Sequence, residues 1–222
     1  MNRRQFLTGA GSISLSALAG CASTQETLKP EPVLEAPRIP LKYQTMYGPI
    51  PDERFPIPAV NLDKVPRKFW RQHVDFETPH PVGTLIVNTR TFYLHLVQDG
   101  GKAIRYGVGL GRAGFEWSGD GLIQWKKAWP KWTPPQEMIE REPELEQWSA
   151  ANGGMPPGLD NPLGARALYI FQNGKDTLYR IHGSPEYWTI GKAVSSGCVR
   201  LMNQDIIHLY DRVPTPSNIV VV

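Results

Sequence analysis

Short runs of apolar residues, divided by polar and glycine-containing turns, occupy the chain from residue 82 onward. The runs are rich in β-branched and aromatic residues, a composition typical of strands. They predict strands at 84–88, 92–97, 103–109, 121–126, 167–171, 177–181 and 219–222. Short strands at regular spacing are typical of all-β sandwiches and barrels. The sequence therefore predicts a mainly β, sandwich-like domain over residues 82–222.

Two segments of this domain have helical rather than strand-like patterns. One is 135–141, where Pro135 occupies a position that favours the first turn of a helix. The other is 204–212, which we expect Asn203 to cap and Pro214 to terminate. Acidic residues around the first segment predict a solvated insert that could also close over a site. They are Glu137, Glu140, Glu142, Glu144 and Glu146.

The N-terminus has the pattern of a targeting segment. Arg3 and Arg4 precede an apolar run that is too short and too interrupted to span a membrane, and that leads to Cys21. We interpret residues 1–20 as an export signal of the twin-arginine type, which predicts a protein of the periplasm or cell envelope. Cys21 resembles the acylated cysteine of a lipobox and would then anchor the chain to a membrane. The alternative is an ordinary cleavage site with an incidental cysteine.

Two segments connect this signal to the β domain. Residues 21–41 are rich in Pro, Glu, Lys and Thr and poor in apolar residues, which predicts a proline-rich tether. Residues 42–81 combine prolines with aromatic residues. We expect them to form an extended N-terminal arm that packs on the domain, with a short helix near 64–73.

Charge and cysteine content narrow the classes of function. Removing Arg3 and Arg4 from the 24 basic residues leaves 22, against 21 acidic ones, so no basic field indicates nucleic-acid binding. Cys198 is the only cysteine after Cys21. Paired cysteines of exported proteins usually become disulfides, so a thiol kept without a partner in the chain favours a chemical role over a structural one.

A histidine precedes this cysteine, and small residues flank the thiol: His182-Gly183 comes first, and Ser195-Ser196-Gly197-Cys198 follows. An imidazole can take the proton of a thiol and later return it to a leaving amine. The small residues can form a turn that exposes the sulfur and directs backbone N–H groups at a developing oxyanion. Arg200 could support this turn through carbonyl groups or bind a substrate carboxylate.

Each of these residues could also have a purely structural role. His182 could be a buried core histidine, Gly183 a strand exit, and 195–197 a surface turn. Each such role accounts for one residue, but together they leave an exported lone thiol unexplained. A metal site is not indicated, because no second cysteine lies nearby and the remaining histidines lack ligand spacing. Those histidines are His73, His80, His95 and His208.

The segment resembles the signature of the L,D-transpeptidase (YkuD) family: His-Gly, a loop, then Ser-(His or Ser)-Gly-Cys-(Val or Ile)-Arg. The resemblance covers the chain from Val82 to the C-terminus. Supporting stretches are 105–112, 114–115, 130–135 and 161–168. Ser196 stands where many members have histidine, a departure that leaves His182 as the only base expected near the sulfur.

The resemblance implies a β-sandwich-like catalytic domain that acts on peptidoglycan stem peptides without a cofactor. It implies that Cys198 is the nucleophile and that His182 accepts and donates the proton. Residues that would shape or support the turn and oxyanion site are Ser195, Ser196, Gly197 and Arg200. Cys198 would attack the carbonyl of the third residue of a donor tetrapeptide, release D-alanine and form a thioester. An amine of another stem peptide, or of an envelope protein, would then take the acyl group.

Further residues are candidates for lining the peptide groove, although core packing or loop anchoring explains each aromatic one equally well. The candidates are Gly183, Trp132, Tyr187 and Trp188, with Trp125 and Trp129 beside them.

Three other functions compete with transfer to an amine. Water could resolve the same thioester, which would make the protein an L,D-carboxypeptidase or endopeptidase; the sequence does not separate this from transfer. A sortase also uses Cys, His and Arg, but lacks Ser-Ser-Gly-Cys. A non-catalytic wall-binding lipoprotein would be expected to have lost His182, Cys198 or the glycine, and all three are present.

Overall fold

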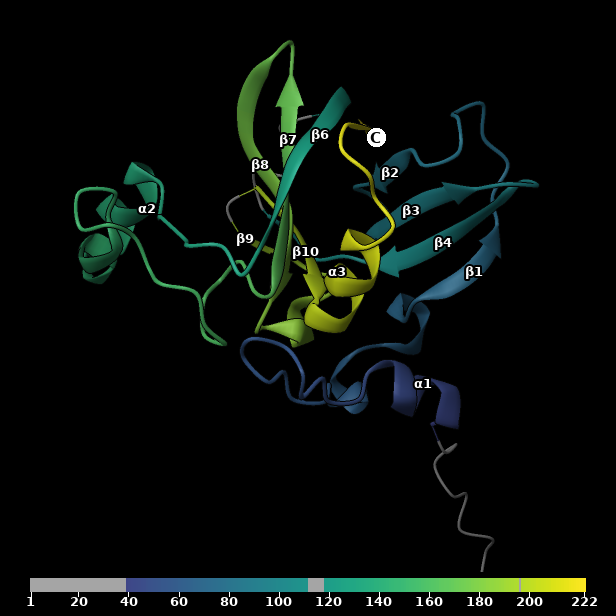
Figure 1. Ribbon diagram of the computed structural model, residues 1–222, viewed down its shortest axis with the longest axis horizontal. Coiled ribbons are helices and arrows are strands. Elements are labelled where there is room, and N and C mark those ends of the chain that lie inside the picture. The colour runs from purple at the N-terminus through teal and green to yellow at the C-terminus, as the bar shows by residue number, and fades with distance from the viewer. Residues whose placement is uncertain (1–38, 112–117, 196) are drawn as a thin grey trace, which may run out of the picture. The chain divides into compact units, whose positions relative to one another are not determined.

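The last strand of the chain, β11 (Ser217–Val221), lies at the centre of a nine-stranded sheet. A computed structural model describes residues 39–111, 118–195 and 197–222. The strand order is β1-β4-β3-β2-β11-β6-β7-β8-β10 (Figure 1). The other strands of this sheet are β1 (Gln72–Asp75), β2 (Leu85–Asn88), β3 (Tyr93–Gln98), β4 (Lys102–Gly107), β6 (Gly119–Ala128), β7 (Arg166–Gln172), β8 (Lys175–Ser184) and β10 (Val199–Met202).

Most neighbouring strands of this sheet are antiparallel, as short hairpin connections require. Two pairs are parallel: β11 with β2, and β10 with β8. A separate parallel pair joins β5 (Leu110–Gly111) to β9 (Ala193–Ser195). Parallel pairing brings distant parts of the sequence together, and it places the His-Gly segment of β8 beside β10, the strand that directly follows the Gly-Cys segment.

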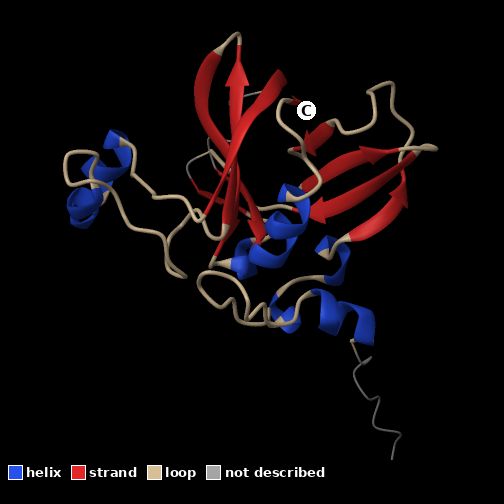
Figure 2. Cartoon of the chain, in the orientation of Figure 1, coloured by secondary structure: helices blue, strands red, loops and turns tan. Residues whose placement is uncertain are grey.

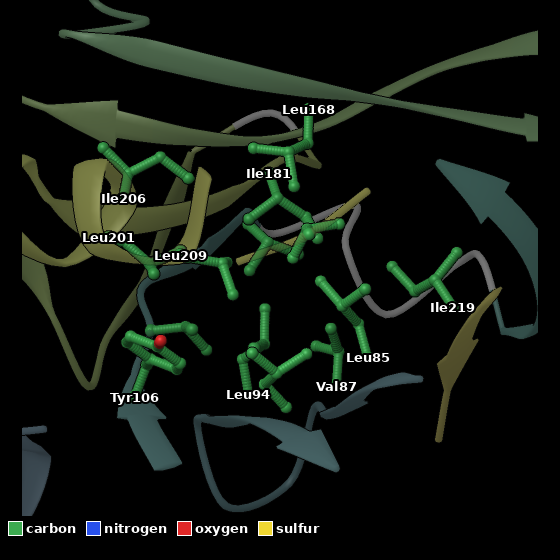
Figure 3. Close-up of a cluster of buried hydrophobic side chains, with 14 of the residues drawn as sticks. Leu85, Val87, Leu94, Tyr106, Leu168, Ile181, Leu201, Ile206, Leu209 and Ile219 are labelled. Atoms are coloured by element: carbon green, nitrogen blue, oxygen red, sulfur yellow. The ribbon is translucent and has the colours of Figure 1, made fainter. Parts of the chain in front are cut away.

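The two halves of the large sheet enclose one hydrophobic core. Leu168 and Ile181 come from the β7–β8 half, and Leu85 and Leu94 from the β2–β3 half, and all four are fully buried in the same cluster (Figure 3). Burying a side chain of this size contributes about 1.5–3 kcal/mol. The mainly β, sandwich-like fold expected from the sequence is therefore confirmed.

Helices are few and short (Figure 2). The α-helices are α1 (Leu41–Met46), α2 (Gln136–Arg141) and α3 (Asn203–Tyr210); the 3₁₀ turns are η1 (Leu62–Lys64), η2 (Arg67–Phe69), η4 (Pro143–Trp148) and η5 (Tyr187–Thr189). Helix α3 buries Ile206 and Leu209 in the core cluster. Within the described residues, no helix has the length and apolar character that a bilayer crossing needs.

All seven predicted strands overlap observed ones, and the two helical segments of the domain match α2 and α3. The short helix expected near 64–73 is confined to the 3₁₀ turn η2, because the chain then becomes β1, which pairs with β4. Asn203 is also not a cap. Met202 occupies the N-cap position, and the Asn203 side chain instead accepts a hydrogen bond from the Ala165 N–H at 3.0 Å.

Residues 42–81 pack on the rest of the domain through a hydrophobic cluster that includes Trp70 and Ile190, and through polar contacts, two of which involve buried or partly buried charges. In the first, which we call the arm anchor (Tyr47, Arg71, Gln204 and Asp205), the arm meets helix α3. Arg71 Nη1 lies 3.1 Å from Asp205 Oδ1, and the Tyr47 hydroxyl donates to Asp205 Oδ2 at 3.2 Å. The second contact is Glu53, which accepts hydrogen bonds from Arg166 Nη1 at 3.0 Å and from Trp129 Nε1 at 2.8 Å. The proposed signal at 1–20, Cys21 and most of the tether at 21–41 lie outside the described residues.

Candidate active site

The parallel pair of β8 and β10 sets the geometry of the site. In its register, Ile181 lies beside Val199 and His182 beside Arg200. Ile181 and Val199 belong to the core cluster, so alternation along each strand places His182 and Arg200 on the opposite face. Cys198 comes two residues before Arg200, which places it toward that same face.

Cys198 follows a glycine turn that ends at β10. Gly197 has a φ of +107°, and a Cβ there would lie 2.6 Å from the ring of Tyr179. A larger residue would strain the backbone and collide with the ring, so the motif needs glycine at this position. The Cys198 thiol is free and partly exposed. Ser195 ends β9 and pairs with Gly111, whereas Ser196 lies outside the described residues.

His182 is 5% exposed, and its Nδ1 lies 2.6 Å from the Gly183 carbonyl oxygen. A carbonyl only accepts, so Nδ1 carries the proton of the neutral ring and Nε2 is left as the acceptor. Burial, together with the positive charges of Arg200 and Arg180, lowers the pKa of His182 to about 4, against the opposing effect of the Gly183 and Pro162 backbone. The imidazole is therefore neutral at physiological pH.

Gly183 continues the strand rather than ending it, since β8 runs to Ser184. The expected strand exit at Gly183 is therefore wrong. A Cβ at Gly183 would collide with Asn203 Oδ1, the same atom that accepts from the Ala165 N–H. The glycine is required because the Asn203 amide crosses over it, and this contact fixes the backbone next to His182.

The thiol and the imidazole rest in their neutral forms. Burial raises the pKa of the Cys198 thiol, while the Arg180 backbone and the charges of Arg180 and Arg200 act to lower it. Across the described residues, no hydrogen bond joins the Cys198 sulfur to His182. The pair can therefore act by proton transfer as the sulfur attacks, rather than as a preformed thiolate–imidazolium pair.

Arg200 is 5% exposed, and its guanidinium lies beneath the backbone of Gly109. The backbones of the two residues also exchange hydrogen bonds of 2.8 and 2.9 Å. Arg200 Nη1 lies 3.5 Å from Glu186 Oε2. Glu186 is held by its neighbours, because its N–H donates to the Ser184 hydroxyl at 3.1 Å and its carbonyl accepts from the Thr189 hydroxyl at 2.6 Å. The other guanidinium nitrogens of Arg200, Nε and Nη2, are buried and have no hydrogen-bond partner in the part of the chain that the structure describes.

The aromatic candidates are distributed over different parts of the domain. Trp188 is 42% exposed on η5, directly after the His-Gly segment, with Tyr187 packed edge-on against it at 5.3 Å. Trp132 instead pairs with Met155 at the base of the insert that carries α2. Trp125 is 44% exposed on β6 and stacks on Tyr169 of β7, with ring centroids 4.0 Å apart. Trp129 binds Glu53. Tyr187 and Trp188 follow His182 closely in sequence, but Tyr187 packs against the buried cluster of the arm and Lys64 lies 5.9 Å from the centroid of the Trp188 ring. The described contacts of Trp132 also lie elsewhere.

Sequence reasoning missed four residues that contact the motif: Tyr179, Arg180, Glu186 and Asn203. A signal existed for Arg180, which lies two residues before His182 on a strand and so shares its face. The others depend on contacts between segments that only the fold brings together. Across the described residues, no cluster of three or more His, Cys, Asp or Glu side chains could hold a metal ion.

A thiol directly before β10 and a neutral imidazole on the neighbouring strand β8, at the edge of a β-sandwich, define a candidate cysteine acyl-transfer site. The family model of the L,D-transpeptidase catalytic domain matches residues 83–222. The chain therefore belongs to the L,D-transpeptidase (YkuD) family, and the resemblance noted in its sequence is confirmed.

Individual proteins are similar to the same segment. "Probable L,D-transpeptidase YbiS" of Escherichia coli K12 is 36% identical over 143 residues, which are 61% of this chain and 43% of that protein. "Probable L,D-transpeptidase ErfK/SrfK" of the same strain is 30% identical over 141 residues, 62% of this chain and 43% of that protein. The match thus spans less than half the length of these relatives.

Among solved structures, a Brucella melitensis protein titled a probable carnitine operon oxidoreductase is 42% identical. It covers 69% of this chain and 94% of its own, with a TM-score of 0.50. The oxidoreductase title belongs to that protein, and the family match of this chain is to the L,D-transpeptidase domain.

Proposed function

We propose that this chain is an exported L,D-transpeptidase in which Cys198 forms a thioester with a peptidoglycan stem tetrapeptide. One observation carries the proposal: a free, partly exposed thiol follows a glycine turn on the strand beside the buried, neutral His182, in a chain of this family. Neutral imidazole is the form that can accept the thiol proton.

In the proposed reaction, His182 takes the thiol proton as the Cys198 sulfur attacks the carbonyl carbon of the third residue of the donor. Backbone N–H groups of the 195–198 turn stabilise the oxyanion. When the oxyanion collapses, the C–N bond to D-alanine breaks, and the leaving amine takes the proton from His182. Because the pKa of His182 is about 4, its protonated form gives up this proton readily. The other product is the thioester.

An acceptor amine resolves the thioester in the second half of the reaction. The amine attacks the thioester carbonyl and loses one proton to His182, an amide bond forms, and the Cys198 sulfur leaves and recovers that proton. A stem peptide would give a 3–3 cross-link, an envelope protein would become attached to the wall, and water would give carboxypeptidase activity. Burial of Arg200 beneath Gly109 favours support of the turn over contact with a substrate carboxylate.

The experiment uses the chain without residues 1–20, incubated with a disaccharide-tetrapeptide and followed by mass spectrometry. Release of D-alanine, a thioester adduct on Cys198 and, with added amine acceptor, a cross-linked dimer are expected. The Cys198→Ala variant should give none of these. If the wild-type chain releases no D-alanine and forms no adduct, the proposal is wrong. Release without dimer formation at high acceptor concentration would identify the hydrolase instead.

We also propose that residues 1–20 direct export and that Cys21 is acylated; the pattern of Arg3, Arg4, the short apolar run and Cys21 supports this. Growth of cells expressing the full chain with labelled palmitate tests the second point. Label should enter the wild-type chain and be lost in Cys21→Ala. The paired change of Arg3 and Arg4 to lysine should keep the protein in the cytoplasm, and normal export of that variant would exclude the twin-arginine route.

A further inference from the structure

Strand β8 contains a β-bulge immediately before the site. Tyr169 pairs with Arg180 and Phe171 with Asp176, so residues 177–179 of β8 lie opposite the single residue Ile170 of β7. Within the bulge Leu178 has a φ of +63°, and its side chain is 75% exposed. The Leu178 N–H donates to Asp176 Oδ1 at 2.9 Å, which holds this conformation. Bulges change the direction of the side chains that follow them, and they are frequent next to active sites.

Arg180 is the first strand residue after the bulge, and its guanidinium is held on several sides. Nη1 and Nη2 donate to the two carboxylate oxygens of Asp176 at 2.6 and 2.8 Å. Nη1 also donates to the Tyr179 carbonyl oxygen at 2.9 Å, and the group lies 4.3 Å from the centroid of the Tyr169 ring. The side chain is only 13% exposed. A two-pronged ion pair of this kind fixes the orientation of the charge.

The register of β8 and β10 places Arg180 at the position beside Cys198, one residue before the Ile181–Val199 pair. Arg180 shares a strand face with His182, and the neighbouring residue Tyr179 packs its ring against Gly197. Both the Arg180 backbone and its charge act on the Cys198 thiol in the direction that favours the thiolate. The other charged or titratable groups here are Asp176, which pairs Arg180 on β8, Arg200 on β10, which Glu186 pairs, and His182 on β8.

We propose that Arg180 is a positioning residue of the thiol site: the bulge and Asp176 hold its charge beside Cys198, where it stabilises the thiolate that forms when the thiol loses its proton. The inference rests on the proposed role of Cys198 as the nucleophile. Arg200 supplies a second charge from β10, beneath Gly109 and 3.5 Å from Glu186. Arg180 supplies the charge on the β8 side of the site.

The test is the pH dependence of alkylation of Cys198 by iodoacetamide, followed by peptide mass spectrometry on the chain without residues 1–20. Arg180→Gln should move the midpoint of the rate profile up by about one pH unit, which is about tenfold slower alkylation below the midpoint. Arg180→Lys keeps the charge and should restore most of the difference.

Arg105→Gln is the matched control, because Arg105 lies over the Tyr93 ring at 4.4 Å on the other half of the sheet. Its midpoint should equal that of the wild type. An unchanged midpoint in Arg180→Gln would overturn the inference, as would an Arg180→Lys midpoint equal to that of Arg180→Gln. An unreactive Cys198 in the folded wild-type chain would instead count against the proposed function. The two failures are therefore distinguishable.

Discussion

The thiol site and the arm anchor both bury charged side chains, but they pair them differently. Asp205 Oδ1 and two nitrogens of Arg200 all lack a hydrogen-bond partner within the described residues, yet only Asp205 has a largely buried ionic partner. In the arm anchor, the two carboxylate oxygens of the fully buried Asp205 face Arg71 at 3.1 Å and the Tyr47 hydroxyl at 3.2 Å. In the thiol site, two nitrogens of the buried Arg200 have no hydrogen-bond partner within the described residues, and its acidic partner Glu186 is half-exposed at 3.5 Å.

The difference separates a structural use of buried charge from a chemical one. The Asp205 carboxylate ties the arm to helix α3 through Arg71 and Tyr47. A buried guanidinium with unsatisfied nitrogens can still interact electrostatically with nearby groups. Buried polar groups of this kind are concentrated at functional sites. We therefore expect changes in the arm anchor to alter stability, and changes in the thiol site to alter chemistry.

The largest expected effect lies in the thiol site. His182→Gln removes the proton acceptor and donor, so the rate of thioester formation should fall by about 10²–10⁴. The free energy of unfolding should change by less than about 2 kcal/mol, because the glutamine side chain still fills the site. Burst kinetics of D-alanine release and urea denaturation measure the two quantities. A loss of stability as large as that expected for the arm anchor would remove the contrast between the two regions.

The second effect lies in the arm anchor. Arg71→Ala leaves the Asp205 carboxylate buried without its cation and should lower the free energy of unfolding by about 3–5 kcal/mol. Urea denaturation with the m-value held constant measures this. Asp75→Asn is the matched control, because it breaks the exposed pair with Lys102 on the same arm and should cost no more than about 1 kcal/mol. Equal losses in the two variants would show that burial of the pair does not matter.

Hydrophobic patterning was sufficient to predict most of the sheet, because alternating strands such as β3 reveal which face is buried. It failed at β1, β5, β9 and β10, which have two to four residues each and too few positions to show a period. The arm strand β1 in particular forms because the backbone of β4 is available to pair with it. That partner is set by the fold and not by the local sequence.

The motif residues of the site could be predicted from the sequence, but their surroundings could not. His182 and Cys198 stand out because of their residue types and flanking glycines. The position of Arg180 depends on the bulge in β8, which is defined by pairing with β7. Gly183 cannot be replaced by a larger residue because of Asn203, twenty residues later. No periodic pattern in the sequence predicts contacts of this kind.

The third prediction concerns the pH dependence of the free energy of unfolding and compares histidines on β3, β8 and α3. Burial lowers the pKa of His95 and His182 to about 4, and that of His208 to about 3. In the unfolded chain these groups take up protons near pH 6.5, whereas the folded chain does not. The stability they contribute is therefore complete above about pH 6.5 and lost as the pH falls toward 4. Burial raises the pKa of Asp205 to about 7, which opposes this trend.

His208 tests this balance, since its Nδ1 lies 2.8 Å from the Tyr106 hydroxyl. His208→Gln should reduce the loss of unfolding free energy between about pH 7 and pH 5 by on the order of 1 kcal/mol. Thermal or urea denaturation at the two pH values gives this difference. An undiminished pH dependence in the variant would show that His208 is protonated equally in the folded and unfolded chains.

The smallest effect lies in the bulge that precedes the thiol site. Leu178 has a left-handed backbone conformation, which costs a residue with a Cβ about 1–2 kcal/mol, and its exposed side chain recovers little of this by burial. Leu178→Gly should therefore raise the free energy of unfolding by about 0.5–1 kcal/mol, measured by urea denaturation. Leu178→Ala is the matched control, because it removes the same exposed side chain but keeps the Cβ, and it should give no gain. If both variants gain equally, side-chain exposure and not the backbone carries the cost. If only glycine gains, the thiol site stores strain in the element that orients Arg180, whereas the arm anchor is held by the ion pair and the hydrogen bond to Asp205.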